Sequence, residues 1–390
     1  MVSRLDHSRP DYDIVISGGG CAGLSLAWHL YRYGPADKRI LLIDPETRDR
    51  NPRTWCYWNP DAVPFHHLRR HSWERFTIHT PQKDLTCRAG SFPGYHAIDS
   101  GTYRNWIYED IAGHPRLEIR HTHTASWNET NKQVTVQTGE GDVTAGILFQ
   151  NHHRESDPYR SSRLSIKQHF IGREIETDQN LFNPGQATFM DFRVDQTRGL
   201  AFMYVLPWSE RSALFEFTFF TPEICEDHVY ENGIRTYLDT HYGLKEPHYS
   251  TIRKEQGVIP MTENLYLRGT RRVRPIGVIS GAVKPSSGYA FTRIQKQCRY
   301  YADQLKYHEI PSYYPPSPPR FRLYDRIMLR IIKDQPATAV QAFARLFSSV
   351  PTSRMLRFLD EETKPKEEVS ILNSVPRLKF LNAAGKELMG

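Results

Sequence analysis

A glycine-rich loop at residues 18 to 23 constrains the fold of this chain more than any other feature. The apolar run YDIVIS precedes the loop, CAGLSLAWHLYRYG follows it with helical spacing, and RILLID forms a second apolar run. Strand, loop, helix and strand in this order begin a dinucleotide-binding βαβ unit. The letters GGGCAG fit the G-x-G-x-x-G fingerprint, and an acidic residue closes the second strand 21 positions after its last glycine. This context makes the match specific.

Each residue of the fingerprint has a predicted role. Gly18 permits the tight turn, Gly20 lets a pyrophosphate approach the N-terminus of the helix, and Gly23 allows the helix to pack closely. Asp44 closes the second strand and is placed to accept hydrogen bonds from ribose hydroxyls. Because the unit is N-terminal and the rest of the nucleotide layer is discontinuous, we expect FAD rather than NAD as the cofactor.

The remaining patterns predict an α/β fold of several parts. Residues 160 to 260 are mostly strand-like with a mixed pattern, which favours an antiparallel sheet. The apolar run at 273 to 279 predicts a short strand, and a helix over 289 to 307 returns the chain to the nucleotide layer. We therefore expect four parts: a discontinuous Rossmann-like FAD-binding domain at 1–155 and 250–310, an antiparallel-sheet substrate domain at 156–249, a proline-rich linker at 311–319, and a C-terminal helical region at 320–390.

Composition and charge exclude several classes of protein. The formal charge is +7 over 390 residues and its basic residues are dispersed, so nucleic-acid binding has little support. No uncharged apolar run approaches the roughly 20 residues that span a bilayer, and the polar start lacks a signal-peptide core. We expect a cytoplasmic protein, soluble or peripheral to a membrane. The amphipathic helix predicted over 321–334 either packs on the body or lies on a membrane surface.

Cysteine and histidine usage predicts neither a disulfide nor a metal site. The five cysteines are odd in number and have no CxxC spacing, which is typical of a reducing compartment. The paired histidines lack a third ligand at a telling distance. These pairs are His66–His67, His121 with His123, and His152–His153.

The stretch LFEFTFF, residues 214 to 220, predicts a buried strand with a carboxyl group in its middle. Together with residues 200 to 208 and the short turn SERS it forms a predicted hairpin. Three phenylalanines then share one face, and Glu216 lies on the other, beside Met203 and Val205. Apolar surroundings raise the pKa of a carboxyl group, so Glu216 is able to hold a proton at neutral pH. The alternative is a glutamate that points to solvent or pairs with an arginine.

Seven blocks of the sequence follow one another in a set order. They are NPRTWCYW, QHFIGREIET, ATFMDFRVDQ, YVLPWSERSALFEFTFF, GVIPMT, KPSSGYAFTRIQ and RFLDEET. In these blocks the chain resembles the flavin-dependent lycopene cyclase family, with Pro52 where aspartate is usual and Ser280 where the late loop (residues 276–288) usually has the first of two glycines.

The resemblance implies a fold of the p-hydroxybenzoate-hydroxylase type, a noncovalent reduced FAD with NAD(P)H as a possible electron donor, a carotenoid substrate, and peripheral membrane association. It also maps the family's catalytic carboxylate onto Glu216, with Phe217 where a second glutamate is usual. We expect Arg53 to contact the cofactor. The late loop would face the flavin through Gly281, Lys284 and Gly288, with Lys284 favouring the negative charge of the reduced ring. A purely structural turn is the alternative for this loop.

These residues permit an acid-initiated cyclisation of lycopene ends, β-rings first among the possibilities, without net redox change. Glu216 or the reduced flavin delivers the proton. Aromatic side chains can offer π faces to a carbocation or can simply belong to the core. They are Trp55, Trp58, Trp208, Phe217 and Tyr289. The acidic cluster at 360 to 362 is interpreted as a solvent-exposed helix end.

Several other functions remain open at the level of sequence. A flavin monooxygenase is disfavoured because the late loop lacks a Gly-Asp pair and residues 148 to 164 lack an Asp-Gly motif. A prenyl reductase, a cyclase of another polyprenyl olefin, and a catalytically silent carotenoid-binding protein stay possible. Ring type, the number of ends closed and the oligomeric state are left open.

Overall fold

The computed structural model describes residues 9–47, 52–88, 94–151, 164–262 and 269–389, and His152–His153 lie outside this part of the chain. Its first sheet is the predicted nucleotide-binding layer. The strand order is β8-β2-β1-β11-β10-β9, with β17 paired to β11. The bounds are β1 Tyr12–Ser17, β2 Ile40–Ile43, β8 Leu117–Arg120, β9 Thr124–Glu129, β10 Val134–Thr138, β11 Gly141–Gln150 and β17 Val273–Pro275.

Parallel pairing defines the centre of this sheet. β1 pairs in parallel with β2 and with β11, β2 with β8, and β11 with β17, whereas β10 is antiparallel to both its neighbours. Helix α1 (Cys21–Tyr33) connects β1 to β2, as the sequence predicted. The predicted strand at 273 to 279 is too long, because β17 ends at Pro275 and a 3-10 turn (η4, Gly277–Ser280) follows.

The second sheet is the predicted antiparallel layer, and it is larger than the segment 156–249. Its order is β16-β12-β15-β14-β13-β5-β6, and only the contact of β13 with β5 is parallel. The bounds are β5 Arg75–His79, β6 Asp84–Arg88, β12 Ser165–Thr177, β13 Gln186–Asp191, β14 Leu200–Pro207, β15 Ser212–Thr221 and β16 Tyr249–Thr262. The sheet therefore takes β5 and β6 from within residues 1–155 and extends past residue 250 through β16.

A small sheet is built from strands within residues 54 to 99 and carries the segment around Trp55. Its order is β3-β7-β4, with β3 Thr54–Tyr57, β4 His71–Trp73 and β7 Tyr95–Asp99. The 3-10 turns η1 (Pro60–Ala62) and η2 (His66–Leu68) connect β3 to β4. Helix α2 (Ser100–Ile111) follows β7, and its N-cap is Asp99, whose carboxylate accepts from the amide of Thr102 at 3.0 Å.

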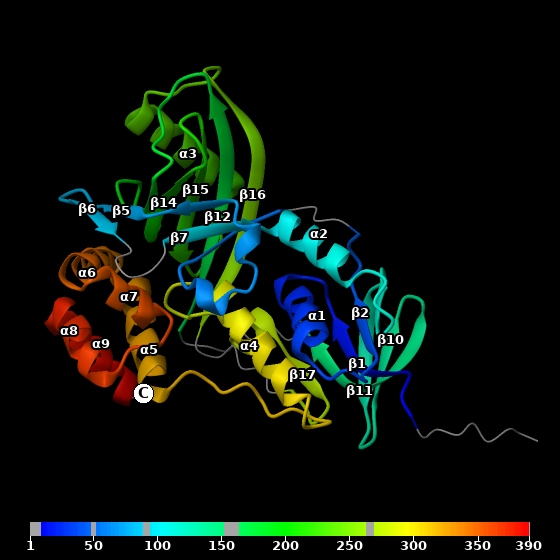
Figure 1. Ribbon diagram of the computed structural model, residues 1–390. Coiled ribbons are helices and arrows are strands. Elements are labelled where there is room, and N and C mark those ends of the chain that lie inside the picture. The colour runs from blue at the N-terminus through cyan, green and yellow to red at the C-terminus, as the bar shows by residue number, and fades with distance from the viewer. Residues whose placement is uncertain (1–8, 48–51, 89–93, 152–163, 263–268, 390) are drawn as a thin grey trace, which may run out of the picture.

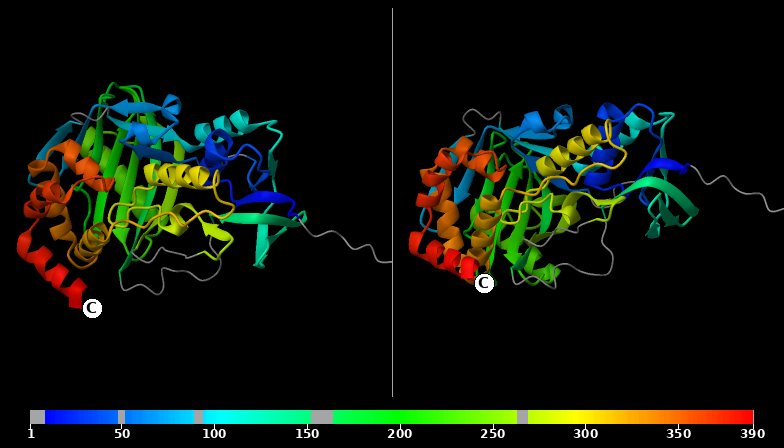
Figure 2. Two further views of the ribbon diagram at one scale, coloured as in Figure 1. Left: turned by 60° about the horizontal axis from the view of Figure 1, so that its bottom comes forward. Right: turned by 90° about the horizontal axis from the view of Figure 1, so that it is seen from below.

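Helices cover both faces of the antiparallel sheet. Helix α3 packs on one face, against Phe215, Phe217 and Phe219. The C-terminal helices cover the other face and form the end of the molecule that lies opposite the N-terminal sheet (Figures 1 and 2). The bounds are α3 Asp227–Tyr242, α4 Phe291–Gln304, α5 Pro319–Asp334, α6 Pro336–Ser349, α7 Thr352–Leu359, α8 Pro365–Ser374 and α9 Arg377–Met389.

The five strands β12 to β16 confirm that residues 160 to 260 are mostly strands, and helix α3 is an element that the sequence did not predict there. It contains Gly233, which weakens the helical signal in the sequence. A Cβ at this position would lie 2.2 Å from Cε1 of Phe217, so the glycine allows the helix to approach the sheet closely. The structure confirms that the predicted amphipathic helix, α5, packs on the body of the protein, since Phe321, Leu329 and Ile332 are buried.

Candidate active site

One cavity of about 620 Å³ connects the glycine loop to the antiparallel sheet. It is lined at one end by Gly20 and Asp44 and on the sheet side by Glu216. Cavities that hold cofactors and small ligands are commonly about 300–1,000 Å³. Of the predicted site residues, Gly20, Asp44, Arg53, Glu216 and Gly288 lie in its lining. The structure thus brings the dinucleotide loop and the predicted acid, almost 200 residues apart in sequence, to one site.

The glycine loop has the shape that its spacing predicted. Gly18 has φ +102°, which favours glycine. A Cβ at Gly23 would lie 1.8 Å from the carbonyl oxygen of Gly18, so a side chain there would strike backbone. Gly20 is the N-cap of α1 and faces the cavity, where the nearest atom to an added Cβ is 3.5 Å away. Gly18 and Gly23 thus shape the loop from outside the lining, and Gly20 borders the open space.

Asp44 is held by partners that the sequence did not identify. The Nη2 atom of Arg104 lies 2.5 Å from Oδ2 of Asp44, and the hydroxyl of Tyr108 donates to the same carboxylate. Arg104 also donates to the carbonyl oxygen of Gly19 at 3.0 Å and lines the cavity. A buried guanidinium beside a dinucleotide loop is suited to anionic groups. The sequence around Arg104 did not indicate this role, because Arg104 contacts Asp44 and Gly19 only when helix α2 packs beside the glycine loop.

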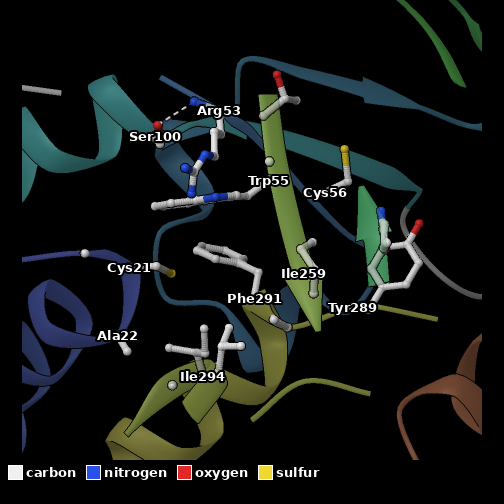
Figure 3. A pocket seen from close by; sticks show the side chains of 18 of the residues that line it. Cys21, Ala22, Arg53, Trp55, Cys56, Ser100, Ile259, Tyr289, Phe291 and Ile294 are labelled. Atoms are coloured by element: carbon white, nitrogen blue, oxygen red, sulfur yellow. Dashed lines mark hydrogen bonds between the residues drawn. The ribbon is translucent and has the colours of Figure 1, made fainter. Parts of the chain in front are cut away.

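Aromatic rings form the middle of the cavity (Figure 3). Trp55 and Phe291 are stacked, with ring centroids 5.4 Å apart and planes at 27°. Tyr289 lies further along, and its hydroxyl is 2.9 Å from that of Tyr95. Tyr204 also lines the cavity and pairs in register with Glu216. The wall is therefore apolar and rich in π faces near the carboxyl group.

The other aromatic residues singled out from the sequence lie elsewhere. Phe217 belongs to the core beneath α3, on the opposite face of the sheet from Glu216. Trp208 stacks under the guanidinium of Arg70, whose Cζ is 4.1 Å from the ring centroid. Trp58 is buried beside Tyr289, with centroids 4.4 Å apart, and does not line the large cavity. Among the five candidates, Trp55 and Tyr289 are the two that face the site.

Glu216 is buried on the cavity side of β15. Its Oε1 accepts a hydrogen bond from the hydroxyl of Thr218 at 2.8 Å. Burial, and after it the neighbouring carboxyl group of Glu255, raise the pKa of Glu216 well above its usual value. Met203 and Val205, which we expected beside it, pair with Phe217 and Phe215 on the other face. Glu255, on β16, is the neighbour that sequence reasoning missed.

Lys284 of the late loop does not face the cavity, contrary to the prediction that it lies near the flavin. This side chain is buried and its Nζ lies 2.9 Å from Asp325 and 3.2 Å from Glu361, outside the cavity lining. Gly281 has φ +83° and also lies outside the lining, whereas Gly288 borders it. Ser280 is turned away from the cavity, because its hydroxyl donates to Gly277 and accepts from Gln297.

The acidic cluster at 360 to 362 is not the solvent-exposed helix end that we expected. Asp360 accepts from the indole nitrogen of Trp58 at 3.0 Å, and burial raises the pKa of its carboxyl group to about 6. Burial also acts to raise the pKa of Glu361, but Lys284 and Arg293 outweigh it and hold that pKa below its usual value. Only Glu362 of the three is exposed. Tertiary contacts with the loop after β17 account for the difference.

The described residues contain neither a disulfide bond nor a recognisable metal site. The five cysteines are free, and no group of three or more histidine, cysteine, aspartate or glutamate side chains is arranged to hold a metal ion within the described ranges. None of the described helices is long and apolar enough to cross a membrane.

The fold is of the FAD-binding Rossmann-like type with an antiparallel-sheet second layer, and the cavity begins at its dinucleotide loop. The chain is similar in structure to halogenase PltM in complex with FAD (TM-score 0.58, 12% identity, 90% of this chain and 79% of that one). It also resembles a geranylgeranyl bacteriochlorophyll reductase-like protein from Thermoplasma acidophilum (TM-score 0.59, 12% identity, 97% and 98%). At such identities the likeness shows the fold alone.

Within this class, the chain belongs to the lycopene cyclase protein family, whose model matches residues 13–384. It is 25% identical to a lycopene beta-cyclase from Pantoea ananas over 299 residues, covering 72% of each chain. It is 24% identical to a lycopene beta-cyclase from Paracoccus sp., covering 72% of this chain and 70% of that one. A neoxanthin synthase from Solanum tuberosum is 22% identical, and the match covers 73% of this chain and 58% of the relative.

Proposed function

We propose that this protein is a carotenoid cyclase that converts the acyclic ends of lycopene to β-rings, with FAD and without net redox change. One observation carries the proposal: a buried carboxyl group with a raised pKa lines the same cavity as the dinucleotide loop, in a chain of the lycopene cyclase family. The carboxyl group is Glu216.

The residues around the glycine loop fit FAD. Gly20 leaves open space at the N-terminus of α1, where a pyrophosphate would meet backbone amides and the positive end of the helix. Arg53 and Arg104 line the same end of the cavity. Ser287, also in the lining, has a buried hydroxyl without a hydrogen-bond partner among the described groups, and it would be free to bond a polar atom of the cofactor. When bound in its reduced form, with NAD(P)H as the electron donor, FAD supplies an electron-rich ring that stabilises nearby positive charge.

Glu216 supplies the acid. Its O–H bond breaks as a C–H bond forms at a terminal double bond, and the resulting tertiary cation is attacked by an internal double bond of the same chain. A C–H bond then breaks to set the ring alkene and its proton returns to the carboxylate, so the product is an isomer of the substrate and no oxidant is needed. Trp55 and Tyr289 offer π faces to the cation, worth roughly 0.5–2 kcal/mol each when desolvated.

The C-terminal helices offer a surface for the membrane in which a carotenoid dissolves. Large apolar side chains on α8 and α9 are exposed, and Leu378 (79%) and Leu381 (66%) are the most exposed of them. Exposed basic residues share these helices. They are Lys366, Arg377, Lys379 and Lys386. Apolar and basic side chains together are typical of a surface that binds anionic lipid.

Pigment analysis tests the function. The chain is expressed in bacteria that accumulate lycopene, the carotenoids are separated by chromatography, and their molecular masses are measured by mass spectrometry. An isomer of equal mass with cyclic ends is the expected product. Unchanged lycopene would contradict the proposal, a gain of oxygen would indicate a monooxygenase, and a gain of hydrogen would indicate a reductase. The Glu216→Gln variant provides the matched control.

A further inference from the structure

Glu216 and Glu255 flank one glycine of the antiparallel sheet. Gly172 on β12 pairs in register with Glu216 on β15 and with Glu255 on β16. Residues at the same register of adjacent strands point to the same face of a sheet, so both glutamates extend over Gly172. An added Cβ at Gly172 would lie 3.0 Å from Cγ of Glu255 and 3.6 Å from Cβ of Glu216. The missing side chain leaves the space in which the two carboxyl groups meet.

Glu255 has more hydrogen-bond donors around it than Glu216, which accepts from the hydroxyl of Thr218. The Oε2 atom of Glu255 accepts from the amide of Thr54 at 3.1 Å and from the hydroxyl of Thr54 at 3.0 Å, and Nη2 of Arg253 lies 3.3 Å away. Its Oε1 has no donor among the described residues unless the carboxyl group of Glu216 carries a proton. Glu255 is only 2% exposed and does not line the cavity. Burial raises the pKa of Glu255 too, but Arg253 and Thr54 act against that rise, so of the two groups Glu255 is the better stabilised as a carboxylate.

The remaining groups around the pair do not change this assignment. Glu216 accepts from the hydroxyl of Thr218 and lies within electrostatic range of the neutral Tyr204, and the thiol of Cys56 lies near both carboxyl groups. Arg253 is shared with Glu174, at 3.0 Å, and with Asp99, at 3.1 Å. Two buried carboxyl groups in contact do not both ionise at neutral pH, because their like charges repel each other.

We propose that Glu216 and Glu255 form a carboxyl pair that shares one proton, with Glu216 as the member that faces the substrate and Glu255 as the positioning residue behind it. The reaction step of this inference rests on the proposed function. The shared proton leaves through Glu216 to the alkene carbon, and the pair then carries two negative charges beside the carbocation. The proton released at ring closure returns to the pair, so the balance of protons and electrons closes without a further reactant.

Infrared spectroscopy tests the pair without any substrate. In the purified flavin-loaded protein, a protonated-carboxyl stretch is followed against pH and assigned to Glu216 by its loss in Glu216→Gln. Its midpoint should fall by about one pH unit or more in Glu255→Gln, because the like charge is removed. The Gly172→Ala variant, which separates the two groups while keeping both, should shift the midpoint in the same direction. If Glu255→Gln fails to fold, the midpoint measured in Gly172→Ala tests the carboxyl pair on its own.

Glu174→Gln is the matched control. Glu174 is a buried carboxylate on β12 that shares Arg253 but does not meet Glu216. Its replacement should leave the midpoint of the Glu216 band in place. An unchanged midpoint in both Glu255→Gln and Gly172→Ala, or no protonated band at neutral pH in the unmodified protein, would overturn the inference.

Turnover separates this inference from the proposed function. The alkaline limb of the rate against pH should move to lower pH in Glu255→Gln, in parallel with the infrared midpoint, and Glu255→Asp should restore part of the shift. If the midpoint of the Glu216 band shifts in Glu255→Gln but the unmodified protein makes no cyclic carotenoid, the carboxyl pair is supported and the proposed function is refuted. If the unmodified protein cyclises lycopene but the midpoint of the Glu216 band does not shift in Glu255→Gln, the proposed function is supported and the carboxyl pair is refuted.

Discussion

The Nζ atom of Lys284 lies 2.9 Å from Oδ1 of Asp325, and both side chains are almost completely buried. This ion pair joins the loop that follows β17 to helix α5. Glu361, at the end of α7, accepts from the same ammonium at 3.2 Å and also pairs with Arg293 at 3.1 Å. The loop that borders the cavity is therefore fixed to the C-terminal helices by charge.

Replacing Lys284 with methionine should destabilise the fold and leave the flavin environment intact. The buried carboxylate of Asp325 would lose its ion-pair partner and Glu361 would keep only Arg293, and breaking such a buried pair costs about 3–5 kcal/mol. Lys296→Met is the control, since Lys296 pairs with Glu362 near the surface and such a pair contributes about 0–1 kcal/mol. Urea unfolding and the visible flavin spectrum measure the two effects. A stable Lys284→Met variant with reduced flavin content would instead support the cofactor role expected from the sequence.

Two glycines of the loop should fail differently when alanine replaces them. Gly23→Ala places a Cβ 1.8 Å from the carbonyl oxygen of Gly18, so the loop and the helix after it must shift. Gly20→Ala meets no atom closer than 3.5 Å, so the protein should fold normally and bind FAD less tightly, because the new methyl group enters the space next to the helix N-terminus. Thermal unfolding and flavin content after gel filtration distinguish the outcomes. Equal loss of stability in both variants would contradict this division.

The Glu216→Gln variant should keep FAD and lose cyclisation. Removal of a general acid lowers the rate by about 10²–10⁴-fold. Flavin absorbance and the yield of cyclic carotenoid per flavin measure the two quantities. Glu223→Gln, an exposed residue that follows β15, serves as the control and should cyclise normally. Retained turnover in Glu216→Gln would remove Glu216 from the mechanism.

The raised pKa of Glu216 makes stability depend on pH with a definite sign. The folded protein binds this proton more tightly than the unfolded chain, whose glutamate pKa is about 4.3. The contribution to stability is therefore fully present below that value and is lost as pH rises toward the folded pKa. Glu216→Gln should be stabilised relative to the unmodified protein more at pH 8 than at pH 5. Melting temperatures at the two pH values test this, and an equal shift at both would contradict it.

Membrane binding should depend on the exposed leucines of α9. A Leu378→Asp, Leu381→Asp double variant should bind anionic vesicles several-fold more weakly, since apolar insertion is replaced by repulsion from the lipid charge. Vesicle flotation measures the bound fraction. Tyr307→Asp is the control, because Tyr307 is 81% exposed but lies outside α8 and α9. Equal weakening by the control would point to net charge rather than to this surface.

Local patterns in the sequence were sufficient for the nucleotide-binding unit and for the hairpin. The period of apolar residues distinguishes β1, α1 and β2, and the glycine spacing fixes the loop between the first two. Alternation along β15 likewise placed Glu216 on the face opposite Phe217. Each of these features depends on residues close together in the chain, so the sequence alone determined them.

Tertiary structure decided which distant groups meet. Glu255 contacts Glu216 because β16 and β15 flank β12 in one register, and no pattern within either strand specifies that neighbour. Lys284 faces Asp325 rather than the cavity because burial of a charge requires a partner, and the C-terminal helices supply one. Strand register and the pairing of buried charges are properties of the packed chain, which is why the acid could be predicted from the sequence and its carboxyl partner could not.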